Sequence, residues 1–575
     1  MMKSLTKQVV VADLNDSIDS VVRRMAKKSR NVKYPGLAVV LNNQGQLEGI
    51  LTDGDIRRAY ARDVSFKDKV SNVMIDDPIT LPVDTLAEKT LDEIRTTIEG
   101  KSRLNANWVR HILFVDKQKK VVKVVDYVEL MQNASMSLKN IAVLGLGYVG
   151  LTLAVYLANQ GYRLTGNDIN QNLISQLQNG NPHIHEPGLA DMLKVNLEHE
   201  KINFQTQLTN DHDIYILAVG TPLDSENKPD LSFIEKAVKE ISKFLKLNDQ
   251  IMIRSTIPVG TTRHYIIPLL EDKTGLKAGD DFSISFVPER TVEGNAINEL
   301  RTLPQIVGGY SNRCLKRGSA FWSTVVSTVV QVSSLEAAEL VKLANNTYRD
   351  LSFAFSNEIA LLADRHNIDS FELINAANEG YPRNPIPLPS PGVGGYCLSK
   401  DPFLYGSVIE GGKNKAKLGL ISREINQEAA LYPIEKLKVF AKKKNYDLKN
   451  LSVVIIGIAY KGIPETTDIR ASVAVKIFEE LKNQVSKITG WDYVVQERIL
   501  KNVGFHTNKN LQKSINESNV ILILNNHPGN VISEVLQPSE NGRLIFDGWR
   551  QYNANEISKI EGLTYATMGY MSEIK

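Results

Sequence analysis

A glycine-rich turn between an apolar strand and a helix constrains the fold of this chain more than any other feature. Residues 140–144 form a run typical of a buried strand, and Gly145-Leu146-Gly147-Tyr148-Val149-Gly150 follows directly. The next strand-like run ends at Asp168, about 20 residues further on. Such a turn lies close to a pyrophosphate at the start of a helix, and the acid binds ribose hydroxyls. The sequence therefore predicts a doubly wound dinucleotide-binding domain. A carboxylate would repel the 2′-phosphate of NADP, so we expect NAD.

Three later loops carry polar residues at the ends of further predicted strands. Thr221, Thr256 and Glu289 each follow an apolar run of strand-like composition. In open α/β sheets, ligands bind beyond the carboxyl ends of the strands, so these side chains are expected to line one crevice. For each loop considered singly, helix capping is an equally good interpretation.

A second glycine-rich stretch, residues 391–402, contains one of the two cysteines. Lys400 and Asp401 follow Cys397 by three and four residues. A nearby cation lowers a thiol pKa from about 8.5, and the glycines let the backbone approach a substrate. The alternative is a buried structural cysteine, a common fate of free cysteines. Cys314, outside every motif, is interpreted as structural.

Composition narrows the class of protein. The 575 residues are 42% hydrophobic and 23% charged, with a net charge of +3, so several domains are expected and no nucleic-acid or membrane partner is predicted. Two cysteines indicate a reducing compartment, and the N-terminus has no apolar signal region. We therefore expect a cytoplasmic protein, and we predict no metal site.

Residues 1–135 consist of two similar halves, each with a strand, a helix and two further strands. The first half places these elements at 9–11, 17–27, 36–41 and 47–52, and the second at 79–81, 86–98, 112–115 and 121–125. A polar junction follows at 133–137. The repeat, with residues 49–57 as its signature, resembles a tandem pair of CBS domains.

The CBS resemblance implies a nucleotide site. Its Thr-x-x-Asp spacing places Thr52 and Asp55 beside a ribose, with an adenine nucleotide as the possible effector. The second half keeps Asp126 but has Lys123 at the position assigned to the threonine. The alternative is a pair of CBS folds used only for packing and assembly.

Residues 334–377 contain helix formers, apolar residues at helical spacing and no proline or glycine, which predicts a long helix. Lys342 and Asn346 are four residues apart, so they share one face and can reach one substrate.

Over residues 138 to about 570 the chain resembles the UDP-glucose/GDP-mannose dehydrogenase family. The motifs that carry the resemblance are Gly145–Leu151, Glu186–Leu189, Val219–Pro222, Ser255–Thr261, Pro288–Arg290, Glu339–Asn346 and Gly394–Asp401. The resemblance implies an α/β fold: two Rossmann-like doubly wound domains joined by a long central helix and a helical dimer core, preceded by the CBS module. The expected domains are 138–333 for NAD, 334–432 for dimerisation and the cysteine loop, and 433–575 for the UDP-sugar.

The resemblance also implies a reaction, the oxidation of a sugar C6 hydroxyl to a carboxylate with two NAD. Cys397 would hold the aldehyde as a thiohemiacetal and then as a thioester. Lys342 and Asn346 would stabilise oxyanion charge, Asp401 would carry protons, Glu289 would orient or relay a proton to a water, and Thr256 would position that water. Thr256, Glu289, Lys400 and Arg470 are also expected at the cofactor.

The positions of Arg290, Arg349 and Arg383 resemble those in the branch of the family that acts on UDP-N-acetylhexosamines. The resemblance implies a substrate of the ManNAc or GlcNAc type and a role in polysaccharide biosynthesis. UDP-glucose is the alternative substrate. Gly394 and Lys461 complete the expected substrate site. The spacing from Lys461 to Arg470 is about two residues longer than usual, and Arg470 is expected to act across a homodimer or larger homo-oligomer. The alternative class of function is a nucleotide-sensing regulator whose dehydrogenase domains have lost activity. Such a protein would have no reason to keep all of the expected catalytic residues, which are Cys397, Lys342, Asn346, Glu289 and Asp401.

Overall fold

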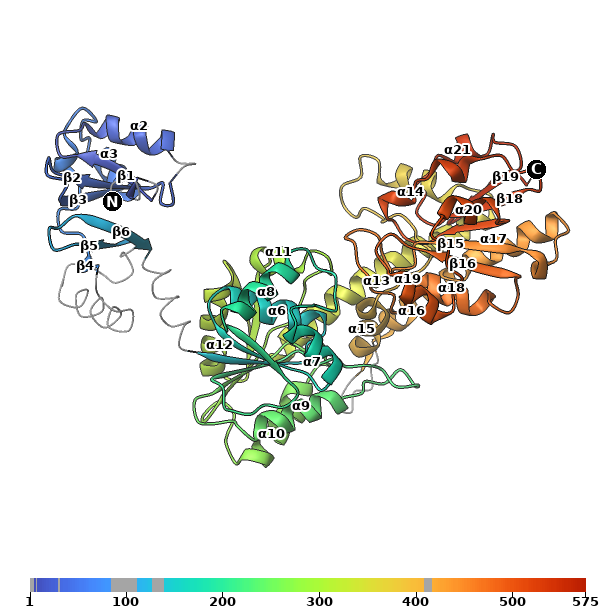
Figure 1. Ribbon diagram of the computed structural model, residues 1–575, viewed down its shortest axis with the longest axis horizontal. Helices are drawn as coiled ribbons and strands as arrows, with labels where there is room; N and C mark the ends of the chain where they lie inside the picture. Colours follow the sequence, from blue (N-terminus) through green and yellow to red (C-terminus); the bar gives the residue numbers. More distant parts are fainter. Residues whose placement is uncertain are drawn as a thin grey trace. The chain divides into compact units, whose positions relative to one another are not determined.

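The computed structural model describes residues 5–6, 8–28, 32–83, 111–126, 139–407 and 416–574 (Figure 1). The chain forms two compact units, residues 1–138 and 139–575. The helix predicted at 86–98 and the junction at 133–137 lie outside the described residues.

The N-terminal unit repeats one strand arrangement. In the first half β1 pairs parallel to β2, and β2 pairs antiparallel to β3; β4, β5 and β6 pair in the same way. Its elements are β1 (Val10–Asp13), α2 (Ile18–Lys28), β2 (Leu37–Leu41), β3 (Leu47–Thr52), α3 (Asp53–Ala61), η1 (Val70–Asn72), β4 (Thr80–Pro82), β5 (His111–Val115) and β6 (Val121–Asp126). The β2–β3 and β5–β6 hairpins each have a shift in strand register at the equivalent position, between Val40 and Leu41 and between Phe114 and Val115.

The strand register corrects the sequence alignment of the two halves. Thr52 pairs with Leu37, the first residue of β2, and Asp126 pairs with His111, the first residue of β5. Asp126 is therefore the counterpart of Thr52. Lys123 is the counterpart of Gly49. The prediction that Lys123 replaces the threonine was therefore wrong, because it placed the two halves three residues out of register. Glu129, three residues after Asp126, lies outside the described residues.

The first large sheet has eight strands in the order β14-β13-β12-β11-β10-β7-β8-β9. All neighbours are parallel except β12 and β13. Its strands are β7 (Asn140–Leu144), β8 (Arg163–Asn167), β9 (Ile202–Gln205), β10 (Ile214–Leu217), β11 (Gln250–Ile253), β12 (Ser283–Phe286), β13 (Gln305–Gly309) and β14 (Val329–Val332). The helices are α6 (Tyr148–Asn159), α7 (Gln171–Gln178), α8 (Leu189–Glu198), α9 (Ser232–Ser242), η3 (Thr262–Ile266), α10 (Ile267–Thr274), α11 (Ala296–Thr302) and α12 (Asn312–Val325). Strands β7 and β10 to β12 are almost wholly buried, as their continuous apolar runs predict.

The second sheet has six strands in the order β16-β15-β17-β18-β19-β20, of which only β19 and β20 are antiparallel neighbours. Its elements are η4 (Leu448–Asn450), β15 (Ser452–Ile456), α18 (Val473–Leu481), β16 (Lys487–Trp491), α19 (Glu497–Val503), α20 (Leu511–Asn516), β17 (Val520–Ile523), η5 (Pro528–Asn530), η6 (Ser533–Leu536), β18 (Arg543–Asp547), α21 (Ala554–Ile557), β19 (Leu563–Thr567) and β20 (Tyr570–Met571). The two doubly wound sheets confirm the predicted α/β fold class.

Helix α13 (Leu335–Arg365) lies between the two sheets along the chain, followed by α14 (Ser370–Asn378), α15 (Tyr396–Gly406), α16 (Lys417–Ala429) and α17 (Tyr432–Lys443). It packs against α15 and α16. The prediction of a single helix over 334–377 was wrong in its second part, because the helix ends at Arg365 and a new one begins at Ser370. Asn367 adopts a left-handed φ of 54°, and Asp369 caps a new helix by accepting hydrogen bonds from Phe371 N and Glu372 N. Both residue types favour such breaks.

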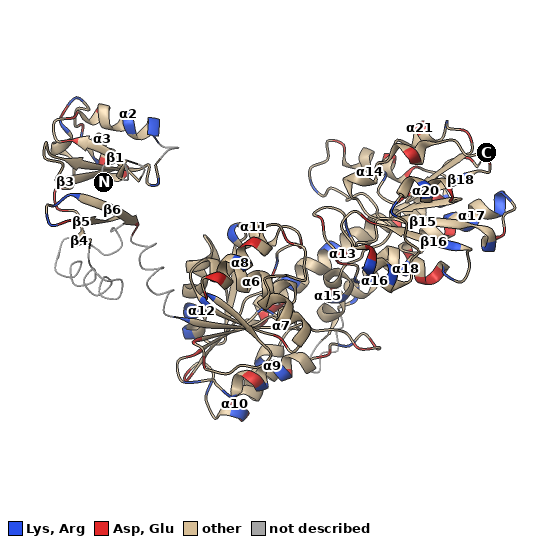
Figure 2. Ribbon diagram, in the orientation of Figure 1, with Lys and Arg blue, Asp and Glu red and all other residues tan. Residues whose placement is uncertain are grey.

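Figure 2 shows basic and acidic residues interspersed over the helices of the visible face. Among the described helices, none is both long enough and apolar enough to cross a membrane.

Candidate active site

In the glycine turn after β7, two glycines are packed tightly against other backbone and the one between them faces open space. A Cβ on Gly145, whose φ is 90°, would lie 2.7 Å from Val219 Cα, and a Cβ on Gly150 would lie 1.8 Å from the Gly145 carbonyl oxygen. A Cβ on Gly147 would meet nothing within 4 Å. Helix α6 begins directly after Gly147 without a side-chain cap, so its first N–H groups are available to a pyrophosphate.

Two polar side chains extend this cradle along the strand ends. Asp168 Oδ2 accepts a hydrogen bond from Leu146 N at 2.9 Å, which fixes the carboxylate beside the turn. The Thr221 hydroxyl is buried and has no protein partner among the described residues. These residues fit NAD, with the pyrophosphate at the turn and the ribose at Asp168.

The cysteine loop and α13 bring four predicted catalytic residues together. Cys397 lies in the first turn of α15, and Lys342 and Asn346 lie on α13. Asn346 Nδ2 donates to Asp401 Oδ2 at 2.6 Å, and Lys400 Nζ lies 3.0 Å from Asp401 Oδ1. Asp401 is fully buried, so the Lys400 ammonium offsets its charge and the Asn346 amide donates to one of its oxygens out of contact with bulk water.

The electrostatics of Cys397 differ from the sequence expectation of a lowered thiol pKa. The residue is exposed to solvent, yet desolvation by the surrounding protein raises the pKa of its thiol. Lys342 and Lys400 act in the opposite direction, but Asp401 and Glu293 add to the increase. The thiol form is therefore favoured in this structure, because desolvation outweighs the two lysines.

Glu289 is paired with a residue that the sequence interpretation missed. Its carboxylate forms a buried ion pair with Arg254 at the end of β11, and the guanidinium also lies 4.6 Å from the centre of the Trp322 ring. Burial by itself raises the pKa of Glu289, but Arg254 and Lys342 lower it to about 2. Thr256, two residues after Arg254, is half-buried in the same loop.

A cavity of about 610 Å³ adjoins α13. It is lined by Arg290, Lys342, Ala344, Asn345, Asn346, Tyr348 and Arg349. Two predicted substrate arginines, Arg290 and Arg349, therefore meet the catalytic face of α13. The third, Arg383, is exposed and stacks on Tyr381 at 5.6 Å, so it does not line this cavity.

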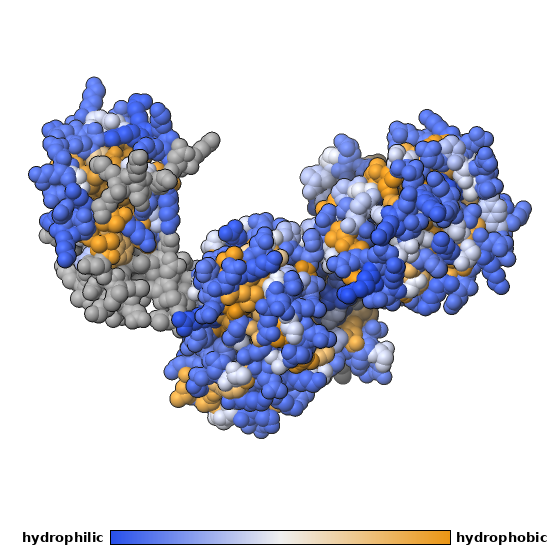
Figure 3. Space-filling model, viewed as in Figure 1, coloured by the Kyte–Doolittle hydropathy of each residue, from blue (hydrophilic) through white to orange (hydrophobic). Residues whose placement is uncertain are grey.

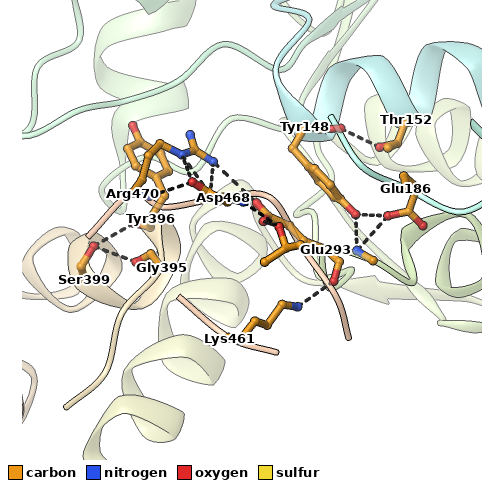
Figure 4. A network of polar contacts seen from close by, with 12 residues as sticks. Tyr148, Thr152, Glu186, Glu293, Gly395, Tyr396, Ser399, Lys461, Asp468 and Arg470 are labelled. Atoms are coloured by element: carbon orange, nitrogen blue, oxygen red, sulfur yellow. Dashed lines mark hydrogen bonds and ion pairs between the residues drawn. The ribbon is translucent and has the colours of Figure 1, made fainter. Parts of the chain in front are cut away.

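The second sheet's first loop contacts the loop that follows Glu289 (Figure 4). Lys461 Nζ donates to Glu293 O at 2.6 Å, and Arg470 Nη2 lies 3.6 Å from Glu293 Oε1. Arg470 also pairs with Asp468 at 2.6 Å and stacks on the Tyr396 ring at 4.7 Å. Arg470 thus lies beside the cysteine helix of its own chain, and its predicted action across a dimer stays a prediction.

Two further predicted residues hold backbone in place. The Tyr148 hydroxyl bonds to Glu186 and accepts from Gly294 N at 2.7 Å, so this side chain fastens the 291–295 loop to α6 (Figure 4). A Cβ on Gly394 would lie 2.8 Å from Ala471 O, which explains why the cysteine loop needs a glycine there.

In the N-terminal unit, Thr52 and Asp55 form a reciprocal capping box at the start of α3. Thr52 Oγ1 donates to Asp55 Oδ2 at 2.6 Å, and Arg58 Nη2 lies 2.5 Å from Asp55 Oδ1. Both oxygens of Asp55 thus have partners within the helix. A ribose at this position must compete with Arg58.

Models of three domains of one family match consecutive parts of residues 139–575. The NAD binding domain of the UDP-glucose/GDP-mannose dehydrogenase family matches residues 139–326, the central domain 336–428 and the UDP binding domain 454–554. A CBS domain model matches residues 2–62. The UDP-N-acetyl-D-mannosamine dehydrogenase of Pyrococcus horikoshii is 34% identical over 412 residues, which are 71% of this chain and 94% of that protein.

The chain belongs to the UDP-glucose/GDP-mannose dehydrogenase family. A Campylobacter jejuni relative with the same printed name is 33% identical over 67% of this chain and 95% of its own length. The solved structure of the Pyrococcus horikoshii enzyme superposes with a TM-score of 0.67 at 32% identity, covering 75% of this chain and 99% of that one. As a member of this family, the protein is an NAD-dependent oxidoreductase, which confirms the cofactor predicted from the glycine turn.

Sequence reasoning assigned no role to Arg254, Glu293 or Asp350. Arg254 ends a strand directly before Ser255 and Thr256, and a charged residue at the end of a buried strand is a usable signal. Asp350 follows Lys342 by eight residues, so helical periodicity places it on the same face of α13. Glu293 lies in a loop, and no periodicity could have located it.

Proposed function

We propose that this protein oxidises the C6 hydroxyl of UDP-N-acetyl-D-mannosamine to the carboxylate, using two NAD and one water. The observation that carries the proposal is Cys397 close to Lys342 and the Asn346–Asp401 pair, beside a cavity lined by Arg290 and Arg349. The printed names of the relatives from Pyrococcus horikoshii and Campylobacter jejuni support the choice of sugar. An N-acetylated uronic acid of this kind serves polysaccharide biosynthesis.

NAD, when bound, accepts a hydride from C6 in each of the two oxidations. In the first, Asp401 takes the hydroxyl proton while the alcohol becomes an aldehyde. Lys342 and Asn346 donate to the C6 oxygen and stabilise its developing negative charge. Asn346 retains one N–H for this purpose, because an amide carries two and only one is given to Asp401.

The second oxidation uses a covalent bond to the protein. The Cys397 sulfur attacks the aldehyde carbon while Asp401 gives the proton taken in the first oxidation to the C6 oxygen and accepts the thiol proton in its place, which yields a thiohemiacetal. After Asp401 has released its proton to solvent, it takes the hydroxyl proton of the thiohemiacetal as the second hydride leaves the same carbon, and a thioester remains. A water positioned by Thr256 then cleaves the carbon–sulfur bond and releases the carboxylate, the thiol and one proton. Glu289 orients this water as an anion, because its pKa of about 2 makes it a weak base for relaying a proton.

The test is the Cys397→Ala variant with UDP-N-acetyl-D-mannosamine and NAD. We expect it to bind both compounds by calorimetry and to form no acid by mass spectrometry. The Cys397→Ser variant is expected to accumulate a poorly hydrolysed ester, visible as added intact mass. Acid production by the alanine variant at the parent rate would refute the covalent route.

UDP-N-acetylglucosamine, other UDP-N-acetylhexosamines and UDP-glucose are the alternative substrates. NADH formation across a panel of UDP-sugars ranks them by kcat/KM. A higher kcat/KM for UDP-glucose than for every N-acetylated sugar would replace the proposed substrate and leave the catalytic residues unaffected.

A homodimer or larger homo-oligomer is supported by apolar side chains left exposed on α13. Tyr348, Phe355 and Leu362 are 71%, 52% and 51% exposed, and their seven-residue spacing puts them on one face. Figure 3 shows apolar residues at the surface in the region of α13 and α14. We expect a second copy of the chain to cover this face. A Phe355→Glu variant should lower the mass measured by light scattering, and an unchanged mass would count against this interface.

An adenine nucleotide bound by the N-terminal unit is proposed as an effector. Its support is the position of Thr52 and Asp126 at matching ends of β3 and β6. Because Arg58 occupies one oxygen of Asp55, Arg58→Ala should tighten binding of AMP or ATP to the full chain. If neither nucleotide binds, or if bound nucleotide leaves the rate of NADH formation unchanged, the effector role fails.

A further inference from the structure

One face of α13 carries a row of polar residues that extends beyond the catalytic pair. Lys342, Asn346 and Asp350 follow one another at four-residue spacing, and Asn357 lies two turns further along. Asp350 and Asn357 are completely buried, far from the usual environment of such side chains. Neither has a part in the chemistry described above, so their burial needs another explanation.

Asn357 holds the start of the cysteine loop. Its Oδ1 accepts a hydrogen bond from Ser390 N at 2.9 Å, and its Nδ2 donates to Asn426 Oδ1 of α16 at 3.0 Å. The amide therefore joins α13, α16 and the loop through both of its polar atoms. Ser390 stands seven residues before Cys397.

Asp350 holds the middle of the loop through Arg423 of α16. Asp350 Oδ1 lies 2.7 Å from Arg423 Nη1, and Asp350 Oδ2 accepts from Ser422 Oγ at 2.9 Å. The same guanidinium lies 3.5 Å from Val393 O, four residues before Cys397. The loop lies close against α16 here, because a Cβ on Gly392 would come within 3.0 Å of Asn426 O.

Helix α13 also holds the segment after Cys397, since Asn346 of α13 donates a hydrogen bond to Asp401. Figure 1 shows α15 and α16 next to α13. We propose that Asp350, Asn357 and Arg423 are positioning residues that set the cysteine loop against Lys342. One rigid helix thereby fixes both the nucleophile and the cation that acts on the C6 oxygen. The inference rests on the proposed function, because it concerns the step in which Cys397 captures the aldehyde.

Loss of this alignment has a specific consequence. The first hydride transfer needs no bond to Cys397, whereas capture of the aldehyde does. A displaced loop therefore slows capture more than aldehyde formation, and free aldehyde escapes. A misplacement of about 1 Å costs about 100-fold in rate, so even partial loosening should change the ratio of aldehyde to acid by at least about tenfold.

The experiment compares Asn357→Ala and Asp350→Asn with the parent full-length protein. UDP-N-acetyl-D-mannosamine and NAD are supplied with hydroxylamine, which traps free aldehyde as an oxime, and mass spectrometry measures the ratio of oxime to acid. We expect the ratio to rise at least about tenfold in both variants, with the KM for NAD unchanged. This ratio does not depend on how much enzyme is folded, so partial unfolding alone leaves it constant.

The matched control is Asp364→Asn, which alters a partly buried ion pair of the same helix with Lys436 at 2.6 Å but contacts no residue of the cysteine loop in the described structure. Its oxime-to-acid ratio should equal that of the parent. A parent-like ratio in both Asn357→Ala and Asp350→Asn, or an equal increase in Asp364→Asn, would overturn the positioning role. Absence of both acid and oxime with the parent protein would instead refute the proposed function.

Discussion

Breaking the buried pair between Arg254 and Glu289 should be among the most destabilising single changes in the first large sheet. In Arg254→Met the carboxylate of Glu289 stays buried without its main partner. Arg254, the stronger of the two cations, and Lys342 hold the pKa of Glu289 at about 2 against the usual value of 4.5, a difference that corresponds to about 3 kcal/mol. Removing one partner of a buried pair costs about 3–5 kcal/mol, a similar size.

The sign of the pH dependence follows from the lowered pKa. A carboxyl group whose folded pKa is depressed contributes stability above its unfolded pKa, and that contribution is lost as pH falls from about 4.5 to about 2. Urea unfolding at pH 7 should therefore separate Arg254→Met from the parent by about 3 kcal/mol, and the gap should narrow at pH 4. The double variant Arg254→Met/Glu289→Gln should recover part of the loss, because no buried charge is left unpaired. A parent-like midpoint for Arg254→Met, or no recovery in the double variant, would refute the reasoning.

Three other predictions test separate parts of the molecule. Lys119 adopts a left-handed φ of 60°, at the hairpin position where the first half has a glycine, so Lys119→Gly should stabilise the N-terminal unit by about 1 kcal/mol in thermal unfolding. Alkylation of Cys397 should titrate above the pKa of a free thiol, and Lys342→Met should raise that pKa further; an unshifted titration in both proteins would contradict the assigned charges. Asp168→Ala should weaken NAD binding about tenfold by calorimetry, through loss of about 1.5 kcal/mol of hydrogen bonding to the ribose, while UDP-sugar binding stays unchanged.

Short-range patterns were enough to predict much of the architecture. The turn at Gly145 and the acid at Asp168 predicted the first sheet, because a strand, turn and helix with that spacing have few alternatives. Helical periodicity predicted the shared face of Lys342 and Asn346. The break of the long helix at Asn367 was missed, since an isolated asparagine is tolerated within helices and only its left-handed conformation ends this one.

Pairs between distant segments could not be predicted in the same way. Arg254 and Glu289 lie 35 residues apart, and Asp350 and Arg423 lie 73 apart, so their contacts depend on how sheets and helices pack. The equivalence of Thr52 and Asp126 likewise depended on strand register, which a matching irregularity in both hairpins fixes. Sequence spacing predicted the residue types of the site, whereas packing determined their charge states.

The raised pKa of Cys397 bears on how the aldehyde is captured. If the thiol stays protonated in the free enzyme, the nucleophile forms only when a base takes its proton during attack. Asp401 is suited to this task, because it pairs with Lys400, is held by Asn346, and acts electrostatically on the thiol. A thiol activated only at the moment of attack is also less open to oxidation, since the thiolate is the reactive form. The same buried carboxylate then serves both oxidations, which gives a physical reason for fixing it and the cysteine loop to a single helix.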